Sequence, residues 1–278
     1  MEPLQIQKRP REMLLLDRTG EIGPADIARA FAMDELLGRR ASGGGPAICH
    51  LWRHPRAFVI GSKDGRLPGA PDAVRWLKEQ DYSVLVRHSG GAAVPLDPGV
   101  VNVSLILPAE SETPGAFNDD FERMFELIQA TLSVYGGEVG RGEVAGSYCP
   151  GDYDLHIDGL KICGIAQRRQ VGATVVQAFV NVEPSGPERA RLVRSFYDRA
   201  GLGASPGDYP DVRPETMSSL QERGIRGADR AESFAAAIVS TLEAFGAKSF
   251  DEPGAFRLPG QDELDAAVRR LRERHPLR

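Results

Sequence analysis

The chain has few cysteines and no long apolar run. Its 278 residues include three cysteines, none in the C-x-x-C spacing typical of zinc and redox sites. A disulfide framework and a zinc site are therefore not indicated, and free thiols in a reducing compartment fit better. The longest apolar patch near the beginning, three leucines before Asp17, is far too short for a signal sequence or a membrane span. We expect a cytoplasmic protein without a metal and without membrane contact.

An excess of positive charge is also missing. The 34 Lys and Arg residues against 39 Asp and Glu leave a net charge of -5. This balance offers no electrostatic footprint for nucleic acid or for an anionic membrane, so we expect neither as a partner. No repeat, low-complexity tract or clear linker divides the chain. The length suits one large domain or two small ones, and we prefer a single α/β (α+β) core with a mixed sheet flanked by helices.

Hydrophobic periodicity predicts the elements of that core. Residues 24–37 have a helical pattern behind a proline that suits a first turn. Residues 47–53 and 56–61 are predicted to be neighbouring strands, separated by His54-Pro55. Further along, the pattern predicts a helix over 71–80, buried strands at 83–88 and 100–107 that flank a glycine-rich loop, a helix through 121–132, a strand over 174–182, a loop at 201–214, and a helical C-terminal part.

Asp158-Gly159, between two alternating runs, is the strongest local signal, because this dipeptide marks a two-residue β-hairpin. Cys149 lies upstream in a Tyr-Cys-Pro-Gly stretch that favours an irregular loop. If the dipeptide forms the turn, the expected pairs are Ile157 with Leu160, His156 with Lys161, Leu155 with Ile162 and Asp154 with Cys163. Alternation then places four side chains on a single polar face: Asp154, His156, Lys161 and Cys163. Cys149 could fold over this face near Lys161.

A glycine pair follows the strand that ends at Arg87. Glycines without Cβ atoms let the backbone approach a ligand closely and offer N–H groups to a carbonyl or phosphate oxygen. Alone, such a pair after a strand is more often a plain turn.

Together the two motifs resemble the biotin and lipoate protein ligase superfamily in order and spacing. The resemblance covers about residues 45–250 and implies the catalytic-domain fold of that family. It leaves an N-terminal segment and helix over 1–44 and a C-terminal helix over 251–278. It is carried by Arg87, Ser89, Gly90, Gly91, Val94, the strand that contains Asn102, and the run from Asp158 to Gly164.

The loop before the hairpin departs from the ATP-dependent ligases of that superfamily. Those ligases carry an Arg-Asn-Asp type segment where residues 147–152 of this chain read SYCPGD. A cysteine here, with CPGDYDL and GIAQRR around it, resembles the cysteine-dependent octanoyltransferases. The resemblance implies an acyltransferase of lipoate biosynthesis that needs no cofactor. Such an enzyme moves octanoyl from the glycine cleavage system H protein to lysines of lipoyl domains in 2-oxoacid dehydrogenase complexes.

The resemblance also implies residue roles. Cys149 would be the nucleophile that holds the acyl group as a thioester, and Lys161 the cation beside it. A nearby ammonium lowers the pKa of a thiol by favouring the thiolate. Cys49 and Cys163 are expected to be small packed residues. The expected substrate-binding residues are Arg87, Ser89, Gly90, Gly91, Ala92, Asn102 and Gly164.

Three alternatives stay open at this stage. The donor could be octanoyl-acyl carrier protein, because donor choice depends on surface contacts that one sequence does not show. The chain could be an ATP-dependent lipoate ligase, which would need no nucleophilic thiol. It could also be a non-enzymatic module that binds acylated carrier domains. Acyl-chain length, oligomeric state and any general base are likewise open.

Overall fold

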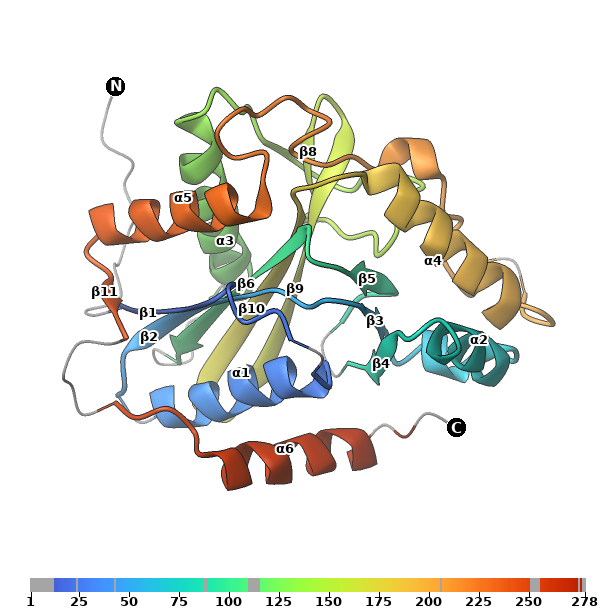
Figure 1. Ribbon diagram of the computed structural model, residues 1–278, viewed down its shortest axis with the longest axis horizontal. Coiled ribbons are helices and arrows are strands. Elements are labelled where there is room, and N and C mark those ends of the chain that lie inside the picture. Colours follow the sequence, from blue (N-terminus) through green and yellow to red (C-terminus); the bar gives the residue numbers. More distant parts are fainter. Residues whose placement is uncertain are drawn as a thin grey trace.

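The computed structural model describes residues 13–23, 25–42, 44–87, 90–109, 116–205, 207–250, 256–274 and 276. An eight-stranded mixed sheet with the order β11-β1-β2-β6-β10-β9-β8-β7 forms its centre, and a three-stranded sheet β4-β3-β5 lies beside it (Figure 1). The predicted α/β class with a mixed sheet flanked by helices is confirmed. In the described part of the chain, no helix is long and apolar enough to cross a membrane.

The strands of the large sheet are β1 (Met13–Arg18), β2 (Ala47–Trp52), β6 (Val100–Pro108), β7 (Gly140–Arg141), β8 (Leu155–Ile157), β9 (Leu160–Gln170), β10 (Ala173–Asn181) and β11 (Lys248–Ser249). Those of the small sheet are β3 (Ala57–Ile60), β4 (Ser83–Val86) and β5 (Val94–Leu96). The helices are α1 (Ala28–Ala41), α2 (Ala70–Lys78), α3 (Ala116–Ser133), α4 (Gly186–Ala200), α5 (Ala231–Ala244) and α6 (Gln261–Arg274), with 3-10 turns at Asp64–Arg66 and Pro214–Thr216.

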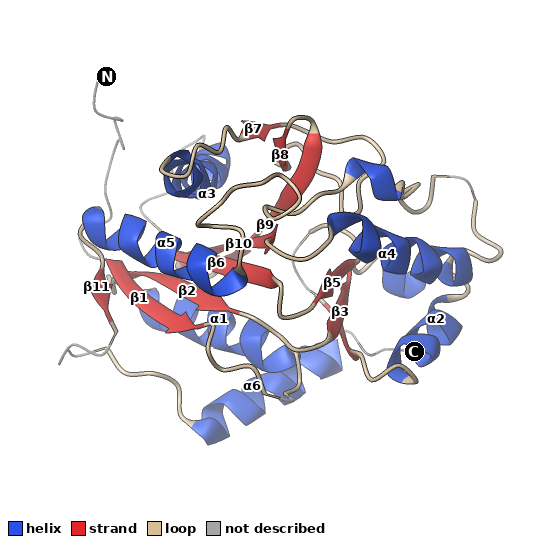
Figure 2. Ribbon diagram, turned by 45° about the horizontal axis from the view of Figure 1, so that its top comes forward, coloured by secondary structure: helices blue, strands red, loops and turns tan. Residues whose placement is uncertain are grey.

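Helices cover both faces of the large sheet, with α3 and α5 on one side and α1 on the other, where α6 packs on α1 (Figure 2). Strand alternation explains the two cores: Cys49 and Leu51 of β2 join the α3 and α5 side, whereas Ile48 joins the α1 side. A third core unites the small sheet, α2 and α4, and includes Trp52 and Phe179 of the large sheet. The two sheets therefore meet on the α1 side. The division of the chain at residues 44 and 250 stays a prediction.

The first helix begins and ends four residues later than predicted. The Asp26 carboxyl accepts a hydrogen bond from the backbone N–H of Ala28, which satisfies one free donor of the first turn and marks the start of α1. The helix continues past Leu37 through two arginines to the buried Ala41. The apolar pattern ended early because the last turn carries charged side chains.

One expected strand arrangement is wrong: β2 and β3 belong to different sheets rather than being neighbours. The segment between β4 and β6 also contains a short strand, β5, that the sequence pattern did not predict. His54-Pro55 ends β2, because proline has no N–H to continue a ladder, and the chain then leaves the large sheet. Periodicity located these strands but carried no information on which sheet each one joins.

The hairpin forms as predicted at its turn and differs further out. Asp158 and Gly159 have φ values of 51° and 76°, the positive pair that a two-residue turn requires, and His156 pairs with Lys161. Beyond that pair a β-bulge inserts one extra residue into β9, so that Leu155 pairs with Cys163 rather than with Ile162. The expected pairs Leu155–Ile162 and Asp154–Cys163 are therefore wrong.

The bulge also changes which side chains share a face. Lys161 and Gly164, three residues apart, come to lie on the same side: the Lys161 side chain is within contact distance of the Cβ position of Gly164. Cys163 joins the apolar core under α3 and α5, together with Ile162. The expectation that Cys163 shares the face of Lys161 is wrong for this reason.

Candidate active site

A pocket opens where the two sheets meet. One row of paired residues crosses the large sheet as its base: Trp52 on β2, Asn102 on β6, Phe179 on β10 and Gly164 on β9. Val59, Val94 and Leu96 of the small sheet form the opposite wall, and Arg87 and Cys149 complete the lining. The free volume of the pocket is about 30 Å³, and its lining is mainly apolar, the character that suits an acyl chain.

Cys149 presents its thiol to this pocket from a strained loop. Its φ of 48° is uncommon for a residue with a side chain. The Sγ atom lies 3.0 Å from Nη2 of Arg87 and 3.4 Å from the backbone N of Ala92. The thiol therefore faces one guanidinium and one N–H donor.

Lys161 lies behind the thiol and holds the main chain of the cysteine loop. Its fully buried Nζ donates to the carbonyl oxygens of Cys149 at 2.7 Å and Tyr148 at 2.8 Å, and it forms an ion pair with Asp154 Oδ1 at 2.8 Å. These short contacts match the three donors of an ammonium. The cation in contact with the sulfur is Arg87, and Lys161 contacts the loop through its carbonyl groups.

Sequence reasoning missed Asp154 and Tyr148 as parts of the site. Burial raises the pKa of the Asp154 carboxyl, and the charge of Lys161 opposes that rise. Tyr148 stacks on Phe179 with ring centroids 5.5 Å apart, and its hydroxyl donates to Asn181 Oδ1. The only available signal for Asp154 was its place on the predicted polar face of the hairpin.

The glycine loop comes close to the thiol at its second glycine. A Cβ atom at Gly91 would lie 2.8 Å from Cys149 Sγ, and one at Gly61 would overlap the Gly91 carbonyl oxygen. Gly91 has a φ of 97°, which also favours glycine. Gly90 is exposed, and its Cβ position has no neighbour within 4 Å, so the structure does not bring it to the thiol. Ser89 lies outside the described residues.

Two further predicted residues line the pocket. Asn102 donates from Nδ2 to the Trp52 carbonyl oxygen at 3.4 Å. Gly164 is required by the packing, since a Cβ there would lie 2.6 Å from the Phe179 ring. The structure therefore brings together Arg87, Ala92, Asn102, Cys149 and Gly164, with Gly91 beside the sulfur and Lys161 behind the loop.

The other two cysteines are inaccessible. Cys49 and Cys163 are fully buried in the core under α3 and α5, and burial raises the pKa of both thiols. Of the three free cysteines, only Cys149 lines the pocket.

The fold and the site define the class of protein. The family model of the lipoyl protein ligase A/B catalytic domain matches residues 26–243, and the chain belongs to this family. Among solved structures it is similar to a lipoate-protein ligase A bound with ATP, with a TM-score of 0.63 and 19% identity over 95% of both chains. It is also similar to P. falciparum LipL1 in complex with lipoate, with a TM-score of 0.62 and 14% identity over 94% of this chain and 72% of that one. These two likenesses show the fold.

The curated relatives are more similar in sequence. The octanoyl-[GcvH]:protein N-octanoyltransferase of Bacillus velezensis is 43% identical over 80% of this chain and 78% of its own length. The protein of the same name from Geobacillus kaustophilus is 40% identical over 81% of this chain and 80% of its own length. The resemblance expected from the sequence is confirmed by these relatives.

Proposed function

We propose that the chain transfers octanoyl from the glycine cleavage system H protein to lysines of lipoyl domains in 2-oxoacid dehydrogenase complexes, as a step of lipoate biosynthesis. Relatives named octanoyl-[GcvH]:protein N-octanoyltransferase support the donor and the acyl group. The observation that carries the chemistry is the Cys149 thiol in the wall of an apolar pocket, in contact with a buried guanidinium. A thiol so placed can hold an acyl chain as a thioester while the chain occupies the pocket.

The proposed reaction has two halves. In the first, Cys149 Sγ attacks the carbonyl carbon of octanoyl-lysine on the donor: the C–S bond forms, the C–N bond breaks, and the thiol proton ends on the departing lysine amine. In the second, the acceptor lysine amine attacks the thioester and the thiol is released. Because one amide replaces another, the transfer needs no nucleotide, and its equilibrium lies near unity.

Arg87 and the glycine loop have the proposed roles closest to the reacting atoms. The Arg87 guanidinium contacts the sulfur directly and would orient the thiol for attack on the acyl carbonyl. The N–H of Ala92 is directed at the same sulfur and would help to hold the oxyanion of the tetrahedral intermediate. Gly91 permits this approach, and Ser89 and Gly90 remain expected contacts of the substrate.

Lys161 acts in this proposal as a positioning residue. Its ammonium fixes the carbonyl groups of Tyr148 and Cys149, and Asp154 fixes the ammonium in turn. The strained backbone of Cys149 is thereby held with Sγ toward Arg87. This differs from the expected role, in which Lys161 would act directly on the sulfur.

The test mixes octanoyl-H protein, an apo lipoyl domain and enzyme, with and without ATP, and follows each protein by intact mass. We expect an octanoyl adduct on the enzyme, transfer without ATP, and transfer in reverse when donor and acceptor are exchanged. Cys149→Ala should lose both adduct and transfer, while Cys163→Ala, the matched control in the core, should retain them.

Other outcomes would point to the alternatives. Transfer only from octanoyl-acyl carrier protein would identify that protein as the donor in place of H protein. Strict dependence on ATP and free octanoate would indicate a ligase, and binding without turnover would indicate a carrier-binding module. The cytoplasmic location stays a prediction, supported by the three free cysteines.

A further inference from the structure

Two hollows adjoin on the α1 side of the large sheet, and three side chains line both: Phe31, Arg87 and Gln177 on β10. The first is the pocket of Cys149. The second has a free volume of about 20 Å³ and is lined by Asp34, Leu85 and Val175, among others. These three side chains therefore lie between the acyl pocket and the second hollow, and Gln177 is the one that the sheet contributes.

The register of the sheet explains this position. Side chains on one face of a strand recur every two residues, about 7 Å apart, so Gln177 is one step beyond Phe179 along β10. Its partners across the sheet are Ser104 on β6 and Ala166 on β9. The row of the pocket base is mainly apolar, and the next row is polar at β6 and β10.

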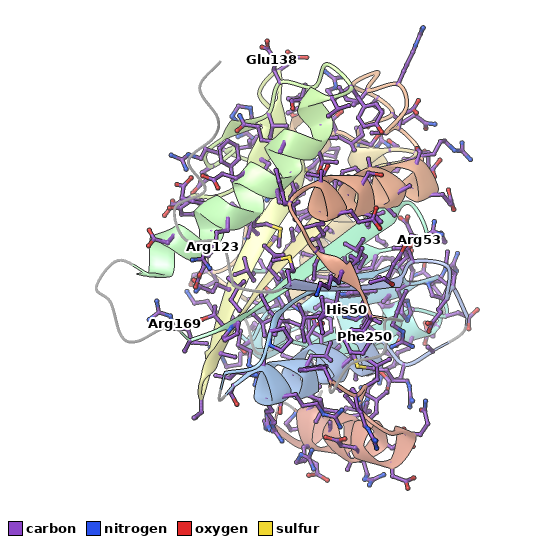
Figure 3. The ribbon with its side chains drawn as sticks, turned by 90° about the vertical axis from the view of Figure 1, so that its left-hand side faces the viewer. His50, Arg53, Arg123, Glu138, Arg169 and Phe250 are labelled. Carbon is purple, nitrogen blue, oxygen red and sulfur yellow. The ribbon has the colours of Figure 1, made fainter. Side chains whose placement is uncertain are left out.

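A buried network fixes the side chain of Gln177. Its Nε2 donates to Asp34 Oδ2 at 2.7 Å, and the same oxygen accepts from Ser104 Oγ at 2.6 Å. Asp34 Oδ1 lies 2.7 Å from Nδ1 of His50, which lies between the sheet and α1 (Figure 3). Asp34, His50 and Ser104 are all buried. Gln177 is therefore the pocket-facing member of a network anchored in the core.

The network also fixes a wall of the pocket. The indole Nε1 of Trp52 donates to Ser104 Oγ at 3.3 Å, and Trp52 packs edge-on against Phe31. Both aromatic rings line the pocket of Cys149. The end of the pocket at Gln177 and the side formed by Trp52 and Phe31 are therefore held by the same hydrogen-bond network.

We infer that Gln177 limits the length of the acyl chain that the enzyme accepts. This inference rests on the proposed function, in which the chain on Cys149 lies in the first hollow. A longer chain must push Gln177 away from Asp34, which breaks a hydrogen bond to a buried carboxylate and opposes the gain from further apolar contact. Gln177 therefore favours medium-length acyl groups over long ones.

The experiment compares H protein that carries octanoyl, dodecanoyl or hexadecanoyl as donor, with an apo lipoyl domain as acceptor. The readout is the ratio of kcat/KM for each long donor to that for octanoyl. Wild-type enzyme should favour octanoyl over dodecanoyl at least tenfold, since mismatched methylenes are rejected to about this degree. Gln177→Ala removes the part of this boundary that the sheet contributes, so the preference should fall toward unity.

Two further variants test whether the effect comes from the side chain of Gln177 itself or from a general destabilisation of the protein. Gln177→Met still fills the space but loses the hydrogen bond to Asp34, so its preference should lie between those of the wild type and Gln177→Ala. Gln167→Ala is the matched control: Gln167 on β9 donates from Nε2 to Asp120 Oδ2 at 2.9 Å and lies outside both hollows. It should keep the wild-type preference. Gln177→Ser also shortens this side chain and replaces the alanine variant if that variant does not fold.

An unchanged preference in folded Gln177→Ala or Gln177→Ser would overturn the inference. So would equal use of octanoyl and dodecanoyl by the wild type, or a loss of preference in Gln167→Ala as large as in Gln177→Ala. Failure of the wild type to transfer octanoyl at all would instead contradict the proposed function.

Discussion

Replacement of Lys161 by methionine should destabilise the protein substantially, because Lys161 is one half of a buried ion pair. Its side chain is 0% exposed and that of its partner Asp154 is 2% exposed, with 2.8 Å between Nζ and Oδ1. Methionine keeps the length and the apolar stem but leaves the Asp154 carboxyl without its counter-ion. Breaking such a pair on one side costs about 3–5 kcal/mol in free energy of unfolding. This is a large part of the roughly 5–15 kcal/mol that stabilises a typical domain.

The loss of stability in Lys161→Met should increase with pH. Burial already raises the pKa of Asp154, and Lys161 opposes that rise, so the pKa rises further in Lys161→Met. A carboxyl whose pKa is raised in the folded state costs nothing below its unfolded pKa, and it costs progressively more as the pH rises through the folded value. The stability deficit of the variant relative to wild type should therefore be larger at pH 8 than at pH 5.

Urea unfolding of both proteins at the two pH values measures this difference. Lys161→Met combined with Asp154→Leu should recover much of the lost stability, since replacement of both partners of a buried pair is often neutral. Lys63→Met, at an exposed lysine, is the control and should change little. A loss below about 1 kcal/mol for Lys161→Met, equal at both pH values, would refute a positioning role based on the buried pair.

Two further predictions concern the thiol. Iodoacetamide at neutral pH should label Cys149 and spare Cys49 and Cys163, because burial raises the pKa of these two thiols. Peptide mapping by mass spectrometry checks this prediction, and faster labelling of Cys163 would contradict it. Arg87→Met should lower the rate of transfer about tenfold to a hundredfold, because it removes a hydrogen bond from a charged donor to the reacting sulfur. An unchanged rate of transfer in Arg87→Met would contradict a role for this contact.

Local sequence determined the features that depend on neighbouring residues. Asp158-Gly159 forms the two-residue turn because few other dipeptides adopt positive φ at both positions. The pairing of His156 with Lys161 follows directly from that turn. The Pro-Gly context of Cys149 likewise predicted a loop in front of the hairpin, and the cysteine that lines the pocket is the one in that loop.

Tertiary structure decided which groups meet at the thiol. Arg87 and Cys149 are 62 residues apart, and they touch because the small sheet packs against the large one. A one-residue bulge in β9 put Lys161 behind the loop and Cys163 in the core, and alternation alone cannot show such an insertion. Asp34 and Gln177, 143 residues apart, form a network that no local pattern signals. Periodicity reports which face of an element is buried, whereas contacts between sheets depend on how the elements pack.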